Sequence, residues 1–324
     1  MNSVTTNVSA LGALTVLSGI NKQQETVRKQ VSSGHRVATA ADPASWSMAT
    51  TMRSDTDSLS TIGDALGLGA SKVDTTYTAM EQGIDLVGKI RDKLACANEA
   101  GVDKTQVNDD ISALKNQLAS VIQSATFSGE NWLYNSKIVV DTQKSVISNF
   151  TRGTNGQVYL ESIAYNSSQA LMVDTADPNR GLFTRAIDAN SLDPDGATTT
   201  RDYYLLNAGT ISLLPAGSRE ISLSPSTTDQ QLTDMMSVTN SILKSLTTAA
   251  STLGVIRERI DAQSSFVQNL SDNISKSIGA SVDTDMDEAS SRQAALTIAQ
   301  KMGVQAVSIA NTTASKVVIL LQGN

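Results

Sequence analysis

Apolar residues recur at intervals of three and four along the stretch that follows Pro43. One row of them repeats every seven residues, and a second row lies beside it, as in a helix that buries one long stripe. The pattern predicts a helix from Pro43 to about Asn98, which would be about 80 Å long at about 1.5 Å per residue. The first row consists of Leu59, Leu66, Val73, Met80, Val87 and Leu94.

Two further segments show the same periodicity. Asp103 is a good cap for a second helix, which we expect to end near the turn-forming sequence TFSGENW at 126–132. A third long helix is predicted across 232–274, where polar Thr239 and Gln263 interrupt the seam and favour one register. Since no helix of this kind buries its stripe alone, we expect the three to pack on one another as a rod.

Residues 136–227 interrupt the helical pattern. Four of the five prolines of the chain fall there, and proline is confined to edges, turns and bulges of sheets. Turn sequences centred on Pro178 and Pro194 separate segments that alternate apolar and polar residues, as strands do. The pattern predicts a small, mostly β insert. Its strand-like segments are KIVVD, QVYLESIAY, DYYLLN and TISLLPAGSREISLS.

The two ends of the chain carry weaker apolar stripes. Residues 3–31 and 294–321 are rich in Ser, Thr, Asn, Gln and Ala. Helices of this composition are marginal in water when isolated, so both ends need a partner. The polar stretch after the first of them runs into Asp42-Pro43, which reads as a helix cap followed by proline at the first helical position.

Composition narrows the class of protein. Aromatic residues make up only 4% of the chain, which is little for a compact core but enough for long packed helices. The net charge of −7 argues against a nucleic-acid partner. The apolar run from Ala10 to Ile20 lacks a preceding positive charge and a clear cleavage site, so we expect no signal peptide. No stretch reaches the length of a membrane span.

No cluster of residues indicates an enzyme, a metal or a cofactor. The only histidine, His35, has no catalytic partner in the sequence, and the only cysteine, Cys96, excludes an internal disulfide. We interpret Cys96 as a small buried residue of the long helix. Gly67 and Gly69 lie inside the heptad run and are interpreted as close-packing positions rather than as a phosphate-binding loop.

One acidic stretch has the spacing of a calcium loop. Asp283, Asp285 and Asp287 alternate as calcium ligands do, but Glu288 occupies the position that requires glycine, so the loop fails. We interpret the segment as the start of a helix, with Thr284 and Asp287 in the capping positions.

Together these features resemble bacterial flagellin. The stretch VSSGHRVATAADPASWSMA, residues 31–49, resembles the signature of the family, in which Ser-Ser-Gly-x-Arg is typical and His35 stands at the x. TFSGENWL resembles the motif that ends the second rod helix, and residues 273–322 resemble the C-terminal pattern. The resemblance covers roughly 1–135 and 228–324, and SWSMATTMRSD is similar to flagellins of alphaproteobacteria.

The resemblance implies a fold and its domains. The fold is mainly α, a long antiparallel helical coiled-coil rod built from both chain ends, with a small β-rich inserted outer domain. Residues 1–42 and 289–324 would be terminal helices of the filament core. Residues 43–135 and 228–288 would form the rod domain, and 136–227 the variable outer domain.

The resemblance also implies how the chain assembles. The terminal helices of flagellins are disordered in the free subunit and pair in the filament core. The candidate joint between core helix and rod consists of Ser33, Gly34, Arg36, Asp42 and Pro43, the last standing where many relatives have an acidic residue. The candidate assembly residues are Leu11, Leu14, Leu17, Leu296, Met302, Ile309 and Leu320.

The function implied is self-polymerisation into the extracellular flagellar filament that drives swimming. The partners implied are further copies of the chain, alone or with other flagellins, a flagellin export chaperone, the filament cap and hook-associated proteins. No nucleic acid or membrane is expected as a partner, no cofactor is expected, and export would follow the flagellar type III route.

Three alternatives are weaker. A hook–filament junction protein shares the terminal patterns but fits the Ser-Ser-Gly-His-Arg signature less well. An enzyme, such as a flagellin with a metallopeptidase insert, would need a His-Glu-x-x-His motif, which is absent from the sequence. A coiled-coil signalling protein fits the β insert poorly.

Overall fold

The computed structural model describes residues 7–36, 43–139, 142–153, 157–192, 201–209 and 213–322. The chain divides into two compact units. Unit 1 comprises Met1–Asp57 and Leu270–Asn324, and unit 2 comprises Ser58–Asn269. Each unit therefore contains helical segments from both the N-terminal and the C-terminal part of the chain.

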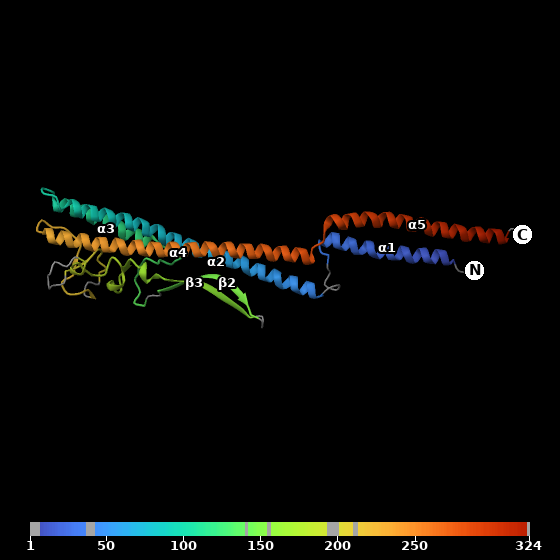
Figure 1. Cartoon of the computed structure of the whole chain (residues 1–324), viewed down its shortest axis with the longest axis horizontal. Helices are drawn as coiled ribbons and strands as arrows, with labels where there is room; N and C mark the ends of the chain where they lie inside the picture. Colours follow the sequence, from blue (N-terminus) through green and yellow to red (C-terminus); the bar gives the residue numbers. More distant parts are fainter. Residues whose placement is uncertain are drawn as a thin grey trace. The chain divides into compact units, whose positions relative to one another are not determined.

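Helices dominate the described residues, as predicted (Figure 1). Two of them, α2 and α4, each span 54 residues. The predicted cap of the second helix is confirmed, because the carboxylate of Asp103 accepts a hydrogen bond of 2.9 Å from the Thr105 amide. The α-helices are α1 (Val8–Ser33), α2 (Pro43–Cys96), α3 (Lys104–Ser124), α4 (Asp229–Val282) and α5 (Met286–Gln322).

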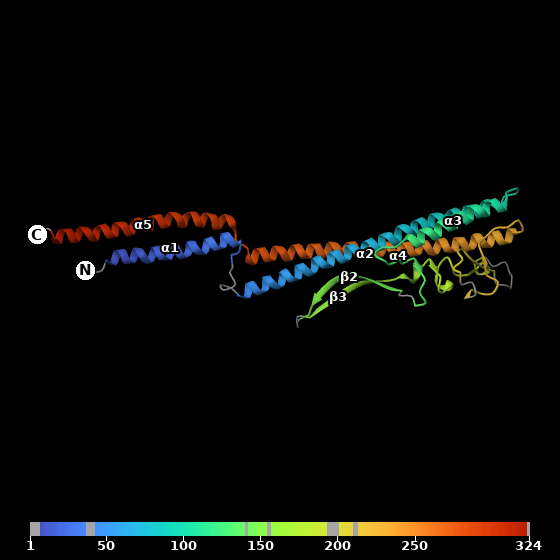
Figure 2. The same ribbon diagram turned by 180° about the vertical axis from the view of Figure 1, so that it is seen from behind.

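Helices α2 and α4 lie side by side in opposite directions (Figures 1 and 2). In unit 2, Asp74 of α2 accepts a 2.7 Å hydrogen bond from Arg257 of α4. In unit 1, Ala49 of α2 packs with Ile278 and Val282 of α4. The predicted seam of α2 is confirmed, since each of its six members is at most 1% exposed.

The polar interruption at Thr239 lies within the buried seam, as predicted. Its side chain is fully buried, but its hydroxyl donates a 2.7 Å hydrogen bond to the carbonyl of Met235 in its own helix. The bond satisfies the buried hydroxyl without a partner from another helix. The hydrogen bond explains how the seam accommodates Thr239, and the effect of this residue on the register stays a prediction.

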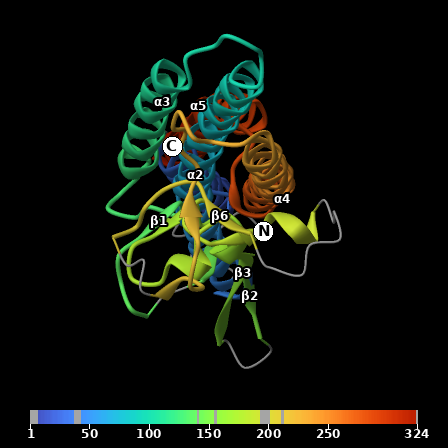
Figure 3. The ribbon, with the colours of Figure 1, turned by 90° about the vertical axis from the view of Figure 1, so that its left-hand side faces the viewer.

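Short strands of unit 2 lie beside the helices α2, α3 and α4 (Figure 3). Strands β2 and β3 form an antiparallel hairpin, β1 and β4 pair in parallel, and β5, β6 and β7 form a three-stranded sheet. The strands are β1 (Tyr134–Asn135), β2 (Gln143–Arg152), β3 (Val158–Asn166), β4 (Val173–Asp174), β5 (Ile187–Asp188), β6 (Asp202–Tyr204) and β7 (Arg219–Glu220). Single 3₁₀ turns occur at Ser167–Gln169, Pro178–Arg180 and Ala189–Ser191.

The strand predictions were right in part. QVYLESIAY covers β3 except for its last residue, Asn166, and DYYLLN contains β6, but Lys137–Val139 of KIVVD form no strand. The predicted turn at Pro194 lies outside the described residues. The longest strand, β2 (Gln143–Arg152), was missed because its sequence mixes polar and apolar residues around a bulge between Ile147 and Asn149.

One of the two heptad glycines is a close-packing position, as predicted. A Cβ atom added to Gly69 of α2 would lie 2.2 Å from Cγ1 of Val146 in β2, whereas one added to Gly67 would meet nothing within 4 Å. The hairpin therefore approaches the helix backbone closely at Gly69 and not at Gly67. The interpretation of Gly67 as a packing position was wrong.

The two glycines should respond oppositely to alanine. We expect Gly69→Ala to destabilise unit 2 by about 1–3 kcal/mol, because the stiff Val146 side chain must move. Gly67→Ala should stabilise it by up to about 1 kcal/mol through helix propensity. Urea unfolding of both variants measures the difference. Adding Val146→Ala to Gly69→Ala should restore part of the loss, and equal effects at both glycines would contradict the hairpin packing.

Candidate assembly surface

Helices α1 and α5 of unit 1 run side by side (Figures 1 and 2). Their shared apolar core is small. Val27 of α1 packs with Ala289 and Leu296 of α5, and Ile20 and Val31 add partly buried side chains. Leu296, one of the candidate assembly residues, thus packs within the subunit, where it contacts α1.

Polar side chains extend the contact along the two helices. The Gln24 amide donates a 3.2 Å hydrogen bond to the Thr297 hydroxyl, and the Gln300 amide donates one of 2.9 Å to the Asn21 side-chain oxygen. Near the start of α1, Asn7 donates a 3.0 Å bond to the Ala310 carbonyl. The pairing is antiparallel, since later positions in α1 meet earlier positions in α5.

Most of the remaining apolar side chains on these helices face outward. Of the candidate assembly residues, Leu11 is 64% exposed, Leu14 55%, Met302 64% and Ile309 67%. Leu17 is half-buried, and the side chain of Leu320 lies outside the described set. Further exposed apolar residues on the same two helices are Val8, Val16, Met286, Ile298, Val304 and Ile319. We call the exposed apolar residues of α1 and α5 the outer apolar surface.

The candidate joint is held to the link between α4 and α5. Gly34 caps α1 in the left-handed conformation, with φ of 72°, which glycine adopts at no steric cost. The Arg36 amide donates a 2.8 Å bond to the Val282 carbonyl, and the Arg36 guanidinium donates one of 3.0 Å to Ser281. Pro43 begins α2, as predicted, and Asp42 lies outside the described residues.

His35 lies in this joint rather than in a catalytic arrangement. Its Nδ1 atom is 3.5 Å from a carboxylate oxygen of Asp283, at a geometry that makes no hydrogen bond. Its ring meets Trp46 of α2 edge to face at 6.1 Å between centroids. The His35 side chain therefore lies between the start of α2 and the link that joins α4 and α5 within unit 1.

The acidic stretch before α5 starts a helix, but with a different cap from the one predicted. The Asp285 carboxylate accepts hydrogen bonds of 3.0 Å from the Asp287 amide and 3.1 Å from the Glu288 amide. Thr284 was predicted as the cap and instead precedes it. Over the described ranges, no three acidic, histidine or cysteine side chains are grouped to hold a metal ion.

Cys96 contradicts its prediction as a small buried residue. It is a free, exposed thiol at the last position of α2. The heptad seam ends with fully buried Leu94, and two residues further on the helix turns its side chain away from that seam.

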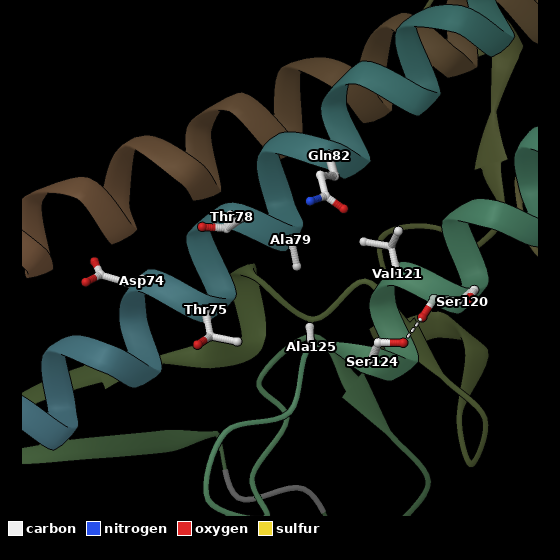
Figure 4. A pocket seen from close by; sticks show the side chains of 9 residues that line it. All are labelled: Asp74, Thr75, Thr78, Ala79, Gln82, Ser120, Val121, Ser124 and Ala125. Carbon is white, nitrogen blue, oxygen red and sulfur yellow. Dashed lines mark hydrogen bonds between the residues drawn. The ribbon is translucent and has the colours of Figure 1, made fainter.

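A shallow groove runs between α2 and α3 in unit 2 (Figure 4). Two of its hydroxyl groups are engaged within their own helices, since Thr75 donates to the Ser71 carbonyl and Ser124 to the Ser120 carbonyl. Ala79, Val121 and Ala125 provide small apolar groups, whereas Asp74 already pairs with Arg257. No convergent set of reactive groups is present among these described residues.

None of the helices in the part of the chain that the structure describes is long and apolar enough to cross a membrane. This agrees with the expectation from the sequence.

Comparison with known proteins agrees with the helical pairing. Residues 4–137 match the bacterial flagellin N-terminal helical region, and residues 236–321 match the bacterial flagellin C-terminal helical region. The chain is 47% identical over 323 residues to Flagellin C of Rhizobium meliloti (strain 1021), covering 99% of this chain and 100% of that protein. It is 33% identical over 325 residues to the flagellin of Brucella melitensis biotype 1, with both chains fully covered.

Proposed function

Because the chain belongs to the bacterial flagellin family and is a subunit of the extracellular flagellar filament, we propose that its outer apolar surface forms the contacts between subunits in the filament core. One observation carries the proposal. After α1 and α5 have paired, large apolar side chains such as Leu11, Met302 and Ile309 remain more than half exposed on them. Exposed apolar area concentrated on one helix pair is typical of an interaction site.

The proposal includes the domain division expected from the sequence. Residues 1–42 and 289–324 would act as filament-core helices, 43–135 and 228–288 as the rod, and 136–227 as the outer domain. Residues Ser33 to Pro43 would join core and rod. The hydrogen bonds of Arg36 to Ser281 and Val282 support this joint, because they hold the segment after α1 against the end of α4.

The partners beyond further copies of the chain are also part of the proposal. They are an export chaperone, the filament cap, hook-associated proteins and other flagellins that co-assemble, with export by the flagellar type III route. The alternative of a hook–filament junction protein is less well supported, since the full-length relatives are named flagellins.

Charge placed on the outer apolar surface should prevent polymerisation. We expect Met302→Glu and Ile309→Glu each to raise the protein concentration needed for filament growth by at least about tenfold, since each loses about 1.5–3 kcal/mol of burial and adds a carboxylate to desolvate. Both side chains are exposed in the subunit, so helical circular dichroism should stay unchanged. Salt-induced polymerisation followed by electron microscopy measures the effect.

The matched control is Gln305→Glu, which adds the same charge at an exposed polar position of α5. Gln305 lies about 20° around the helix from Ile298, on the same side as Met302. Gln305→Glu therefore adds a similar charge there but removes no apolar area, so it should have a smaller effect than Met302→Glu. Normal polymerisation of both Met302→Glu and Ile309→Glu would refute the proposed role of the outer apolar surface.

A further inference from the structure

Helix α5 carries apolar residues on opposite sides. At about 100° per residue, Ile298, Met302 and Ile309 lie about 200–240° around the helix from Leu296. The side that faces α1 holds Leu296 together with Ala289, Gln300 and Gly303. The outward side therefore carries three large apolar residues, whereas the side that faces α1 carries Leu296 and half-buried Val307 among small and polar residues.

Apolar burial alone does not account for this orientation. Turning Ile298, Met302 and Ile309 toward α1 would place three large apolar side chains there instead of Leu296 and Val307, and burial is the dominant favourable contribution to packing. Some other interaction must favour the observed orientation. The candidates are the groups of α1 and α5 that meet only in this arrangement.

Two side-chain pairs meet that requirement. Asn21 accepts from Gln300 at 2.9 Å in an exposed pair, and Gln24 donates to Thr297 at 3.2 Å in a partly buried pair. The pairs are three residues apart on each helix, so both form in one register and one rotation. A shift by one turn or a rotation of α5 would break both bonds. Polar residues buried in a helix seam select orientation at some cost in stability, and the partly buried Gln24–Thr297 pair is of this kind.

A close approach of the helices marks the same orientation. A Cβ atom added to Gly303 would lie 3.0 Å from Cδ1 and 3.8 Å from Cβ of Leu17. The helices pass closely here because residue 303 has no side chain. This contact offers a direct way to measure the rotation of α5.

We propose that the Asn21–Gln300 and Gln24–Thr297 pairs are positioning residues that hold α5 with its more apolar side outward, and so decide which side chains are offered to a second copy of the chain. The inference rests on the proposed role of the outer apolar surface. Its physical basis is that hydrogen bonds are directional whereas apolar burial is not.

The orientation can be read by disulfide trapping in the full chain with Cys96→Ser. The pair Leu17→Cys with Gly303→Cys reports the observed orientation, because a Cβ separation of 3.8 Å is the mean for a disulfide. The pair Leu17→Cys with Met302→Cys reports the rotated orientation, since Met302 faces outward in the structure. Oxidation traps pairing even when it is transient.

The test variant combines Asn21→Leu and Gln24→Leu, which removes both bonds and adds apolar area. The control combines Gln23→Leu and Thr26→Leu, which adds the same side chains with the same spacing at exposed positions of α1. We expect the ratio of observed to rotated cross-links to fall about tenfold in the test variant only, a change that two hydrogen bonds of ordinary strength can supply. Helix content should not fall, and regular filaments should be lost.

The outcomes separate the two proposals. If the cross-link ratio of the test variant stays within about twofold of the control, the positioning role is wrong, whatever happens to the filaments. If the ratio falls and regular filaments still form, the orientation does not decide what is offered to a second copy, and the inference is overturned. If the proposed role of the outer apolar surface is wrong, Met302→Glu should polymerise normally. This variant leaves both polar pairs in place.

Discussion

Removal of residues 290–324 is expected to abolish filament formation while leaving the thermal unfolding of unit 2 nearly unchanged. The deletion removes almost all of α5, including Leu296 and the outward Met302 and Ile309. Unit 2 comprises Ser58–Asn269 and contains none of the deleted residues. Contacts between subunits and the stability of unit 2 therefore depend on different parts of the chain.

The deletion should have a larger effect than any single substitution. Each large apolar side chain contributes about 1.5–3 kcal/mol when it becomes fully buried, and every subunit repeats the loss. The loss of α5 also exposes Val27 and leaves α1 without its partner, and an isolated helix of this length is marginal. Electron microscopy after salt-induced polymerisation and calorimetry of the soluble chain test both halves of the expectation.

A chain ending at Gln322 is the matched control, because it keeps all of α5. It should polymerise like the full chain. Filaments formed by the deleted chain would show that α5 is not needed for contacts between subunits. A melting temperature of unit 2 that falls by more than about 5 °C would show instead that α5 supports unit 2, since a change of about 1 kcal/mol shifts melting by about 2–4 °C in a unit of this size.

Glu220→Gln is expected to destabilise unit 2 by about 3–5 kcal/mol near neutral pH. Lys115 of α3 is only 7% exposed, and its Nζ atom lies 2.7 Å from Glu220 of β7. It also donates to the Ile221 carbonyl. Burial lowers the pKa of Lys115, and the hydrogen bond and charge of Glu220 oppose that shift. The Glu220 charge offsets the free-energy cost of burying the Lys115 ammonium, and Glu220→Gln removes that charge.

The pH dependence of this variant follows from the direction of the shift. Because the folded pKa of Lys115 lies below 10.5, the unfolded chain binds more protons between those two values. In that window this group makes stability rise with pH. Glu220→Gln removes the interaction that opposes the lowering of the Lys115 pKa, so the pH range in which stability rises should extend to lower pH. The loss of stability caused by Glu220→Gln should therefore shrink as pH rises toward 10.5. Urea unfolding at neutral pH and at about pH 9.5 measures this.

Replacing both partners provides the control. Lys115→Met with Glu220→Gln should recover most of the stability, because an apolar residue of similar volume needs no partner in the buried site. Lys115→Met alone should cost less than Glu220→Gln alone, since the Glu220 side chain is 34% exposed and water can solvate it. If Glu220→Gln lowers the free energy of unfolding by less than about 1 kcal/mol at every pH, water already solvates the Lys115 ammonium and the expectation is wrong.

The amino-acid sequence by itself determined the helices of both units and the place of the β insert. The heptad row from Leu59 to Leu94 is buried throughout, and Asp103 and Pro43 begin helices where the pattern put them. These features can be predicted from the sequence because they depend on the spacing of apolar residues and on helix capping, both of which involve residues close together in the chain. The terminal motifs identified the family for the same reason, since they are contiguous stretches.

Only the tertiary structure decided which apolar residues of the terminal helices remain outside. Leu296, Met302 and Ile309 are similar in the sequence, yet Leu296 is buried on α1 and the other two are exposed. Likewise Cys96 is exposed, Asp285 rather than Thr284 caps α5, and β2 pairs in a bulged hairpin against Gly69. Each outcome depends on which surface of one element meets another, and α5, with apolar residues on opposite sides, leaves that choice to hydrogen bonds and close backbone contacts with α1.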